Sequence, residues 1–285
     1  MKQRPVAPSL LTRREATRGL LAVLGGAALL ACGGSSVLAD TDDAGTSGGD
    51  GGGTGTGDSG TTTDSGTSAG SWASGGTKSM KGGYADPFPA TVSACALAVA
   101  VTEGPCTEAA DQVRTDISEG YTGLPMRLAL RVLDASCKPI AGAKVKVWHT
   151  QINGSYSGNT PNNGMCLKDQ ADASKHYFRG AQTTDAAGRV DFDSCFPGWY
   201  RGRTVHIHVS VTVGSKTTTS QVVFDQALVQ EIFASHPEYT SYGQPDTTNA
   251  SDNVVGRGDL AGFTLTTSRL ADGAMMAFKD LVVST

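Results

Sequence analysis

The stretch Val205-His-Ile-His-Val-Ser-Val-Thr-Val213 alternates strictly between apolar and polar residues. Residues two apart in a β-strand point to the same face, so the valines and Ile207 would line one face and His206 and His208 the other. The Cα atoms of the two histidines would lie about 7 Å apart, which lets both imidazoles reach one metal ion. The stretch predicts a strand with a buried apolar face and a candidate metal-binding face.

Other short segments show similar alternation and are separated by turn residues. The expected strands cover residues 126–133, 143–147, 188–192, 205–213, 217–224, 263–266 and 275–283. One helix is expected over residues 225–235, with Asp225 as its N-cap and Pro237 beyond its end. Several short strands with regular turns predict an all-β fold, a β-sandwich with long loops and one short helix.

The N-terminal segment, residues 1–31, has the composition of an export signal. Arg13 and Arg14, typical of a twin-arginine signal, precede an apolar run over residues 19–31. This run is shorter than the about 20 residues that a membrane-spanning helix needs. The sequence Leu-Leu-Ala-Cys-Gly around Cys32 resembles a bacterial lipobox, whose cysteine is acylated. We expect an exported lipoprotein of the bacterial cell envelope, with ordinary signal cleavage as the alternative.

Residues 32–89 are expected to form a flexible tether. Between residues 33 and 83 the chain consists almost wholly of Gly, Ser, Thr, Ala and Asp, and 17 of its 37 glycines fall there. Such a stretch cannot bury enough apolar surface to offset the entropy of ordering it. The folded domain is therefore expected over residues 90–285, which is long enough for a sizeable core.

The charge balance argues against a nucleic-acid partner. The full chain has a net charge of −4, and without residues 1–31 it carries 18 basic and 26 acidic residues. Binding to nucleic acid depends largely on Lys and Arg at phosphates, and no clustered basic patch is present. We expect no nucleic acid as partner and membrane contact only through a lipid on Cys32. The oligomeric state stays open.

Six cysteines fit an exported protein, in which disulfides persist. If Cys32 carries lipid, two bridges and one free thiol are the simplest arrangement of the other five. No Cys-x-x-Cys pair is present, which argues against a thiolate zinc site. The connectivity is open. One hypothesis pairs Cys166 with Cys195, because these cysteines lie in the segments that carry Tyr156 and Tyr200.

Two tyrosines are candidate ligands beside the two histidines. Tyr156 lies in a Gly/Asn-rich loop, and Tyr200 lies in the turn before the strand with His206 and His208. A free phenol has a pKa of about 10, so a phenolate ligand at neutral pH calls for a strong Lewis acid, above all Fe(III). The set differs from the two-histidine, one-carboxylate ligands of ferrous oxygenases. It indicates a candidate ferric site.

Three motifs around these residues carry a family resemblance. They are Phe-Arg-Gly-Ala-Gln-Thr-Thr-Asp over residues 178–185, Gly-Arg-Val-Asp-Phe over 188–192, and Phe-Pro-Gly-Trp-Tyr-Arg-Gly-Arg-Thr-Val-His-Ile-His over 196–208. Together they resemble the intradiol ring-cleavage dioxygenases, in particular their secreted, single-domain branch. The resemblance spans nearly all of residues 95–285. Two features depart from the family pattern, Cys106 after Gly-Pro and the short spacing from Tyr200 to His206, and both bear on substrate choice.

The resemblance implies a non-haem Fe(III) ion held by Tyr156, Tyr200, His206 and His208. Arg203 matches the family's active-site arginine, and Gln221 matches a glutamine that lines the same pocket. The implied substrates are a catechol-type diol and O2, and the implied product is a cis,cis-muconate-type diacid. Tyr200 would leave the metal as substrate binds and take up a proton, while Arg203 would stabilise negative charge on the substrate.

Two other functions compete with this enzyme. The strand, turn and strand over residues 130–147 also resemble transthyretin-like modules, so the alternative is a non-catalytic β-sandwich binding module on the cell surface. Such a module has no reason to keep two tyrosines and two histidines together. A degenerate family member could bind iron without turnover. Which catechol would be cleaved stays open.

Overall fold

The computed structural model describes residues 70–89, 92, 95–109, 112–161 and 164–285. The predicted export signal, the predicted lipid-bearing Cys32 and most of the predicted tether lie outside these residues. Within the part of the chain that the structure describes, no helix combines the length and the apolar character needed to cross a membrane.

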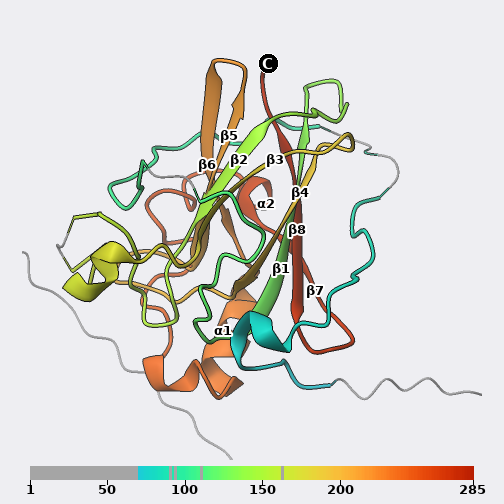
Figure 1. Cartoon of the computed structure of the whole chain (residues 1–285). Coiled ribbons are helices and arrows are strands. Elements are labelled where there is room, and N and C mark those ends of the chain that lie inside the picture. Colours follow the sequence, from blue (N-terminus) through green and yellow to red (C-terminus); the bar gives the residue numbers. More distant parts are fainter. Residues whose placement is uncertain (1–69, 90–91, 93–94, 110–111, 162–163) are drawn as a thin grey trace, which may run out of the picture. The chain divides into compact units, whose positions relative to one another are not determined.

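Two four-stranded sheets build the domain (Figure 1). The first has the order β4-β1-β8-β7 and consists of β1 (Pro125–Leu133), β4 (Arg189–Cys195), β7 (Thr266–Arg269) and β8 (Met275–Val282). The second has the order β3-β2-β5-β6 and consists of β2 (Lys144–Trp148), β3 (Arg179–Thr183), β5 (His206–Val213) and β6 (Lys216–Val223). Only the β1–β8 pair among these is parallel. The predicted all-β sandwich is confirmed.

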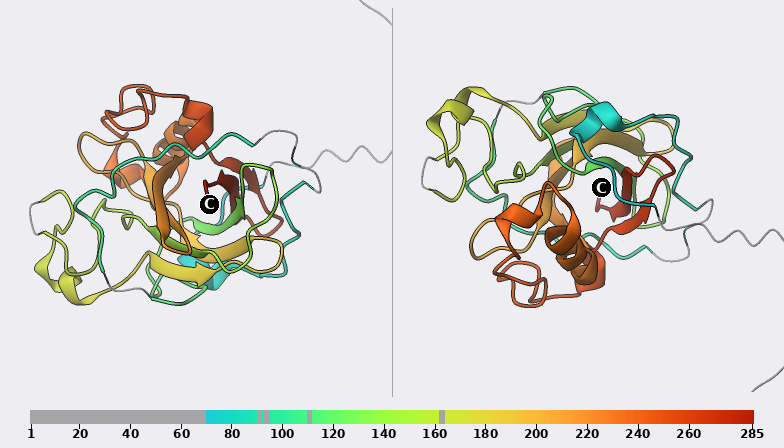
Figure 2. Two further views of the ribbon diagram at one scale, coloured as in Figure 1. Left: turned by 90° about the horizontal axis from the view of Figure 1, so that it is seen from above. Right: turned by 90° about the horizontal axis from the view of Figure 1, so that it is seen from below.

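The apolar core lies between the two sheets. Ile207 and Val209 of β5 belong to one buried cluster with Leu128 of β1, Phe192 of β4 and Met275 of β8. Burying each such side chain contributes about 1.5–3 kcal/mol. Because this face of β5 is committed to the core, His206 and His208 point to the other side of the second sheet. Figure 2 shows the segment around η2 (Gln170–Ser174) on that side, away from β1 and β8.

The expected helix is present as α1 (Gln226–Ser235), and the side chain of Asp225 accepts hydrogen bonds from the first backbone N–H groups. The strand expected over residues 263–266 was wrong. Residues Leu260–Phe263 form a second short helix, α2, and β7 begins only at Thr266. The Asp259 side chain caps α2 by accepting a hydrogen bond from the backbone N–H of Ala261, which favours a helix over the strand that the short apolar alternation predicts.

One strand of the second sheet was not predicted. Arg179–Thr183, with the sequence Arg-Gly-Ala-Gln-Thr, forms β3 along the edge beside β2. It lacks an apolar alternation, because Gly180 has no side chain. A Cβ at Gly180 would lie 2.4 Å from Cγ2 of Ile117, so the strand fits against its neighbour only with glycine there. This strand is thus specified by the close packing at Gly180 and not by a periodic pattern in the sequence.

Residues 70–89, assigned to the tether from composition, lie against the domain. They include η1 (Gly76–Ser79), and the backbone N–H of Ala73 donates to the carbonyl oxygen of Gly273 at 2.8 Å. Phe88 is 9% exposed and packs in a small cluster with Met276. A few aromatic residues thus order a segment that otherwise consists mainly of small and polar residues. The contacts of the domain begin before residue 90.

Two disulfides join Cys95 to Cys137 and Cys106 to Cys166. The hypothesis that Cys166 pairs with Cys195 was wrong. Cys195 ends β4 inside the main core and is free and buried, and burial raises the pKa of its thiol. Its position on the core side of the sandwich keeps it from the loop that carries Cys166.

Candidate metal centre and substrate pocket

Four polar atoms meet at the start of β5, and they belong to the four predicted ligands. Nε2 of His206 lies 3.2 Å from Nε2 of His208, 3.3 Å from Oη of Tyr156 and 3.4 Å from Oη of Tyr200. Tyr156 is fully buried, and the other three side chains are at most 6% exposed. The histidines come from one strand, whereas the tyrosines come from the loop after β2 and the turn before β5.

Two glycines allow the tyrosine segments to touch. A Cβ at Gly154 would lie 1.9 Å from the carbonyl oxygen of Trp199, and a Cβ at Gly198 would lie 2.3 Å from that of Ile152. No larger residue fits at either position without moving the backbone. Oγ1 of Thr150 also donates to the carbonyl oxygen of Gly198 at 2.7 Å. These contacts fix the loop and the turn relative to each other.

Both site histidines are neutral at pH 7. Nδ1 of His206 donates to the carbonyl oxygen of Thr204 at 2.6 Å, so Nε2 directs its lone pair at the cluster. Burial lowers the pKa of His206 to about 3 and that of His208 well below its usual value. The His208 ring stacks on Trp148, with centroids 4.7 Å apart and an interplanar angle of 6°. Neutral imidazoles of fixed orientation are the form that binds metal ions.

The two phenols need a cation before they can ionise. Burial raises the pKa of Tyr156 well above 10 and raises that of Tyr200. A bound cation reverses this penalty because it replaces the phenol proton with a fixed positive charge. Donor separations of 3.2–3.4 Å fit ligands that each lie about 2 Å from a central ion.

The donor atoms therefore fit a hard, strongly Lewis-acidic metal ion such as Fe(III). Two phenolates would offset most of the charge of a trivalent cation, and the two imidazoles would complete the set without adding charge. In residues 70–285, as far as the structure describes them, no group of three or more His, Cys, Asp or Glu side chains could hold a metal. The mixed tyrosine and histidine cluster is thus the candidate centre.

Arg203 reaches this cluster and is held there by a buried carboxylate. Its Nε donates to Oδ2 of Asp252 at 2.9 Å, its Nη1 to Oη of Tyr200 at 3.4 Å, and its Nη2 to Oε1 of Gln221. Burial alone would raise the pKa of Asp252, but hydrogen bonds from Arg203 and from the backbone of Thr204 lower it. The sequence did not single out Asp252, because its partner lies 49 positions earlier.

A pocket with a volume of about 360 Å³ opens beside Tyr200 and His208. We call it the ring pocket; its lining includes Thr102, Gly104, Cys106, Met165, Arg203 and Gln221. Gly104 adopts a positive φ of 77°, and a Cβ there would lie 3.7 Å from Cε1 of His208. Cys106, which is disulfide-bonded, forms part of the wall at the position where the family pattern often has an aromatic residue. The pocket is large enough for a single substituted aromatic ring.

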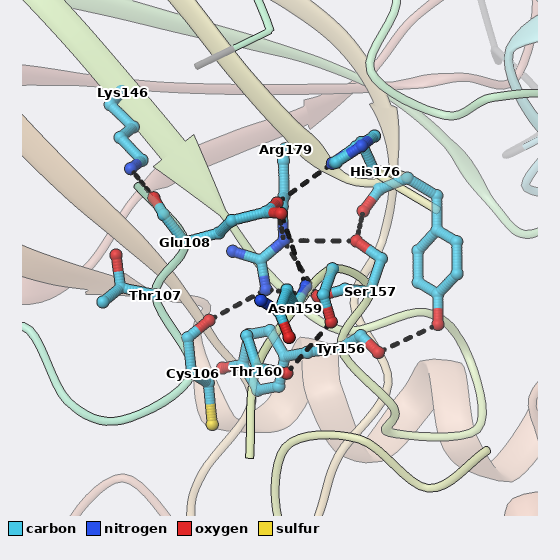
Figure 3. Close-up of polar contacts among 12 residues, drawn as sticks. Cys106, Thr107, Glu108, Lys146, Tyr156, Ser157, Asn159, Thr160, His176 and Arg179 are labelled. Carbon is cyan, nitrogen blue, oxygen red and sulfur yellow. Dashed lines mark hydrogen bonds and ion pairs between the residues drawn. The ribbon is translucent and has the colours of Figure 1, made fainter. Parts of the chain in front are cut away.

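A buried arginine supports Tyr156, and the sequence showed only that it belongs to a motif. Arg179 is 2% exposed, and its Nη2 donates to the carbonyl oxygens of Ser157 at 2.6 Å and Cys106 at 2.8 Å. Its Cζ lies 5.9 Å from the centroid of the Tyr156 ring, and its Nε lies 3.8 Å from Oε2 of Glu108. Figure 3 shows how the arginine joins β3, the Tyr156 loop and the segment with Cys106.

Comparisons with known proteins show which proteins this chain is similar to. The model of the Dioxygenase family matches residues 101–238. No curated protein matches the chain. An intradiol ring-cleavage dioxygenase from Tetranychus urticae is 28% identical, with a TM-score of 0.59, and the similarity covers 67% of this chain and 95% of that one. A second solved dioxygenase is 29% identical, with a TM-score of 0.58 and the same coverage.

The matched segment contains the two tyrosines and two histidines of the cluster as well as Arg203 and Gln221. Over this domain the chain is similar to the intradiol ring-cleavage dioxygenases, a family whose chemistry is the cleavage of catechol-type rings.

Proposed function

We propose that the domain is a non-haem Fe(III) dioxygenase that cleaves a catechol between its two hydroxyl-bearing carbons. O2 is the second substrate, and the product is a cis,cis-muconate-type diacid. The observation that carries the proposal is the convergence of Tyr156, Tyr200 and two neutral imidazoles beside the ring pocket. The similarity to intradiol ring-cleavage dioxygenases supports catechol-type ring cleavage in general.

The proposed metal ligands are Tyr156, Tyr200, His206 and His208. When bound, a ferric ion acts as Lewis acid and template, and draws electron density from the catechol so that the ring reacts with O2. The imidazoles suit this role because their neutral state leaves Nε2 free to bind, and because the Thr204 carbonyl fixes the tautomer of His206.

Tyr200 is the proton acceptor of the proposed reaction. It lines the ring pocket, whereas Tyr156 does not, so a substrate hydroxyl can reach Tyr200 first. As a phenolate, Tyr200 accepts a substrate proton at Oη, becomes a neutral phenol and gives way to the substrate. Nη1 of Arg203 stands 3.4 Å from that oxygen and can hydrogen-bond to it in both states.

Arg203 stabilises negative charge on the bound catechol. Its guanidinium is charged at every working pH, and Asp252 and Gln221 hold it in one orientation. An arginine fixed before substrate arrives needs no reorganisation when charge develops, which is the condition for effective electrostatic stabilisation. Gln221 thus acts through its hydrogen bond to Arg203 and as part of the pocket wall.

Iron loading and oxygen uptake test the proposal directly. The loaded protein is expected to hold iron stoichiometrically, to be red to burgundy through tyrosinate-to-ferric charge transfer, and to incorporate both atoms of 18O2 into a ring-opened diacid. A colourless, iron-free protein after full loading would contradict the proposal and favour a binding module. A coloured protein that consumes no oxygen with catechol, hydroxyquinol or 3,4-dihydroxybenzoate would show iron binding without turnover.

The proposal includes the location of the protein. The paired arginines, the short apolar run and the lipobox-like sequence around Cys32 support export and a lipid anchor in the bacterial envelope. Radiolabelled palmitate should be incorporated into the wild-type chain and not into Cys32→Ser, and only the wild type should fractionate with membranes. Equal labelling of both chains would contradict the anchor.

A further inference from the structure

A second groove adjoins the ring pocket, and the two share Tyr200 and Arg201 in their linings. We call it the outer groove. It has a volume of about 360 Å³, and its other walls come from Ile152, Asn153, Gly164, Lys168, Trp199 and Tyr242. Tyr200 and Arg201 border both hollows, and Arg201 is exposed, so the outer groove is the neighbouring hollow for a substituent on a ring that occupies the ring pocket.

The charges along this path have one sign. Lys168 and Arg201 line the outer groove, Arg201 and Arg203 line the ring pocket, and no Asp or Glu lines either. The chain as a whole is acidic, with a net charge of −4, so the lining of the two hollows differs in sign from the net charge of the protein. Arg203 is engaged by Asp252 and Gln221. Arg201 is exposed and forms no ion pair or side-chain hydrogen bond with any residue the structure describes.

Beside these cations, the outer groove presents apolar and aromatic surface from Ile152, Trp199 and Tyr242. Nε1 of Trp199 donates to the carbonyl oxygen of Gly243 at 3.2 Å, which ties this wall to the segment that carries Tyr242. Tyr242 is 40% exposed and so presents aromatic surface. Nζ of Lys168, which also lines the groove, donates to the carbonyl oxygen of Asn153. An ammonium group has three donors, so Lys168 keeps donors for a ligand.

We propose that the outer groove is a second substrate subsite, which binds the extended, carboxylate-ended substituent of a catechol. The apolar part of the substituent packs on Trp199 and Tyr242, and its carboxylate pairs with Arg201 and Lys168. Arginine suits this task because its planar donors match a carboxylate. This inference rests on the proposed function, because it takes the catechol ring to lie in the ring pocket.

A matched pair of substrates tests the subsite. The acid is 3-(3,4-dihydroxyphenyl)propionate, the neutral partner is its methyl ester, and unsubstituted catechol is the reference. Binding is measured without oxygen from the change in the visible spectrum of the iron-loaded protein, and kcat/KM from oxygen uptake. We expect the acid to be preferred over the ester by about tenfold or more, as for a charge-assisted hydrogen bond. Added salt should reduce this preference.

Three variants locate the effect. Arg201→Gln and Lys168→Gln should each lower the ratio of acid to ester several-fold in both binding and kcat/KM. Tyr242→Ala should instead weaken acid and ester together relative to catechol. Arg257→Gln removes an exposed cation that lines neither hollow, and it is the control for net charge. Its ratio of acid to ester should equal that of the wild type.

The outcomes separate the two proposals. A protein that cleaves catechol but binds acid and ester equally overturns the subsite and leaves the proposed function standing. The same holds if Arg201→Gln and Lys168→Gln keep the wild-type ratio. A protein that holds iron but cleaves none of the three substrates overturns the proposed function. Anaerobic binding then still decides whether the acid is preferred.

Discussion

Tyr156 and Tyr200 offer the same phenol to the same imidazole, but the chain holds them very differently. The backbone N–H of Tyr156 donates to the carbonyl oxygen of Cys166 at 2.7 Å, and its own carbonyl oxygen accepts from Tyr177 at 3.1 Å. Arg179 lies under its ring. Tyr200 instead lines the ring pocket, and the next two residues, Arg201 and Gly202, are exposed.

The difference separates two tasks that one ligand cannot perform well. A ligand that stays on the metal benefits from a buried frame of hydrogen bonds, a disulfide and a fixed cation. A ligand that must give way to substrate and accept its proton needs access to the pocket and fewer bonds to break. We infer that Tyr156 anchors the proposed iron, whereas Tyr200 is the ligand that responds to substrate.

The largest effects are expected from the two phenol deletions, which should differ in kind. Tyr156→Phe should weaken iron retention by at least about 100-fold, more than the loss of an outer partner costs. Tyr200→Phe should keep most of its iron, lose part of the visible band, and lower kcat by about 10²–10⁴ because the proton acceptor is gone. Iron content after dialysis and oxygen uptake measure the two effects. If Tyr200→Phe loses iron and Tyr156→Phe keeps it, the roles are reversed.

Removing the arginine under Tyr156 should have the next largest effect. Arg179→Met leaves the Glu108 carboxylate, whose side chain is 10% exposed, without its buried cation and should lower the free energy of unfolding by about 3–5 kcal/mol. It should also shift the tyrosinate-to-iron band, and Glu108→Gln in the same chain should restore part of the stability. Arg179→Lys should not rescue the band, because lysine lacks the fork that reaches the Ser157 and Cys106 carbonyls.

A matched arginine on the other sheet is the control for Arg179. Arg131 pairs with Asp280 at 2.7 Å, and their side chains are 12% and 26% exposed. Arg131→Met should lower the free energy of unfolding by only about 1 kcal/mol and leave the visible band unchanged. A band that is unmoved in Arg179→Met as well would show that the arginine does not position Tyr156.

The two disulfides allow a smaller and more selective test. Replacing either pair by serine should cost about 2–4 kcal/mol of stability, since the closed segments are similar, with separations of 60 and 42 residues. Only the disulfide between Cys106 and Cys166 lies next to the loop that carries Tyr156. Only its loss should therefore lower iron retention. Chemical denaturation and iron content measure both. Equal iron loss in the two variants would mean that the effect is global.

The last prediction concerns the pH dependence of stability at His149, which lies at the start of the loop that carries Tyr156. Burial lowers the pKa of His149 to about 4, against about 6.5 in the unfolded chain. At this position the unfolded chain therefore binds more protons between these pH values, and His149 alone should lower the stability of the metal-free protein by up to about 3 kcal/mol as pH is lowered through this window. His149→Gln should flatten the dependence by about one proton, as measured by urea unfolding. An unchanged slope would contradict this assignment.

Local pattern was enough to predict most of the sandwich. The alternation of Val205–Val213 follows the two-residue period of a strand, so it already separated the core face from the histidine face. The helix cap at Asp225 is likewise a contact between near neighbours in the chain. β3 and α2 were missed because an edge strand with glycine and a one-turn helix carry little periodic signal.

The sequence by itself determined which residues are candidates at the site, namely the two tyrosines, the two histidines, Arg203 and Gln221, because these stand in short motifs and on one strand face. Only the tertiary structure decided what supports them. Cys106 pairs with Cys166 across 60 residues, and Asp252 holds Arg203 across 49. Arg179 bonds to Cys106 across 73. Such partners are chosen by which loops the folded sheets press together, and no local period encodes that choice.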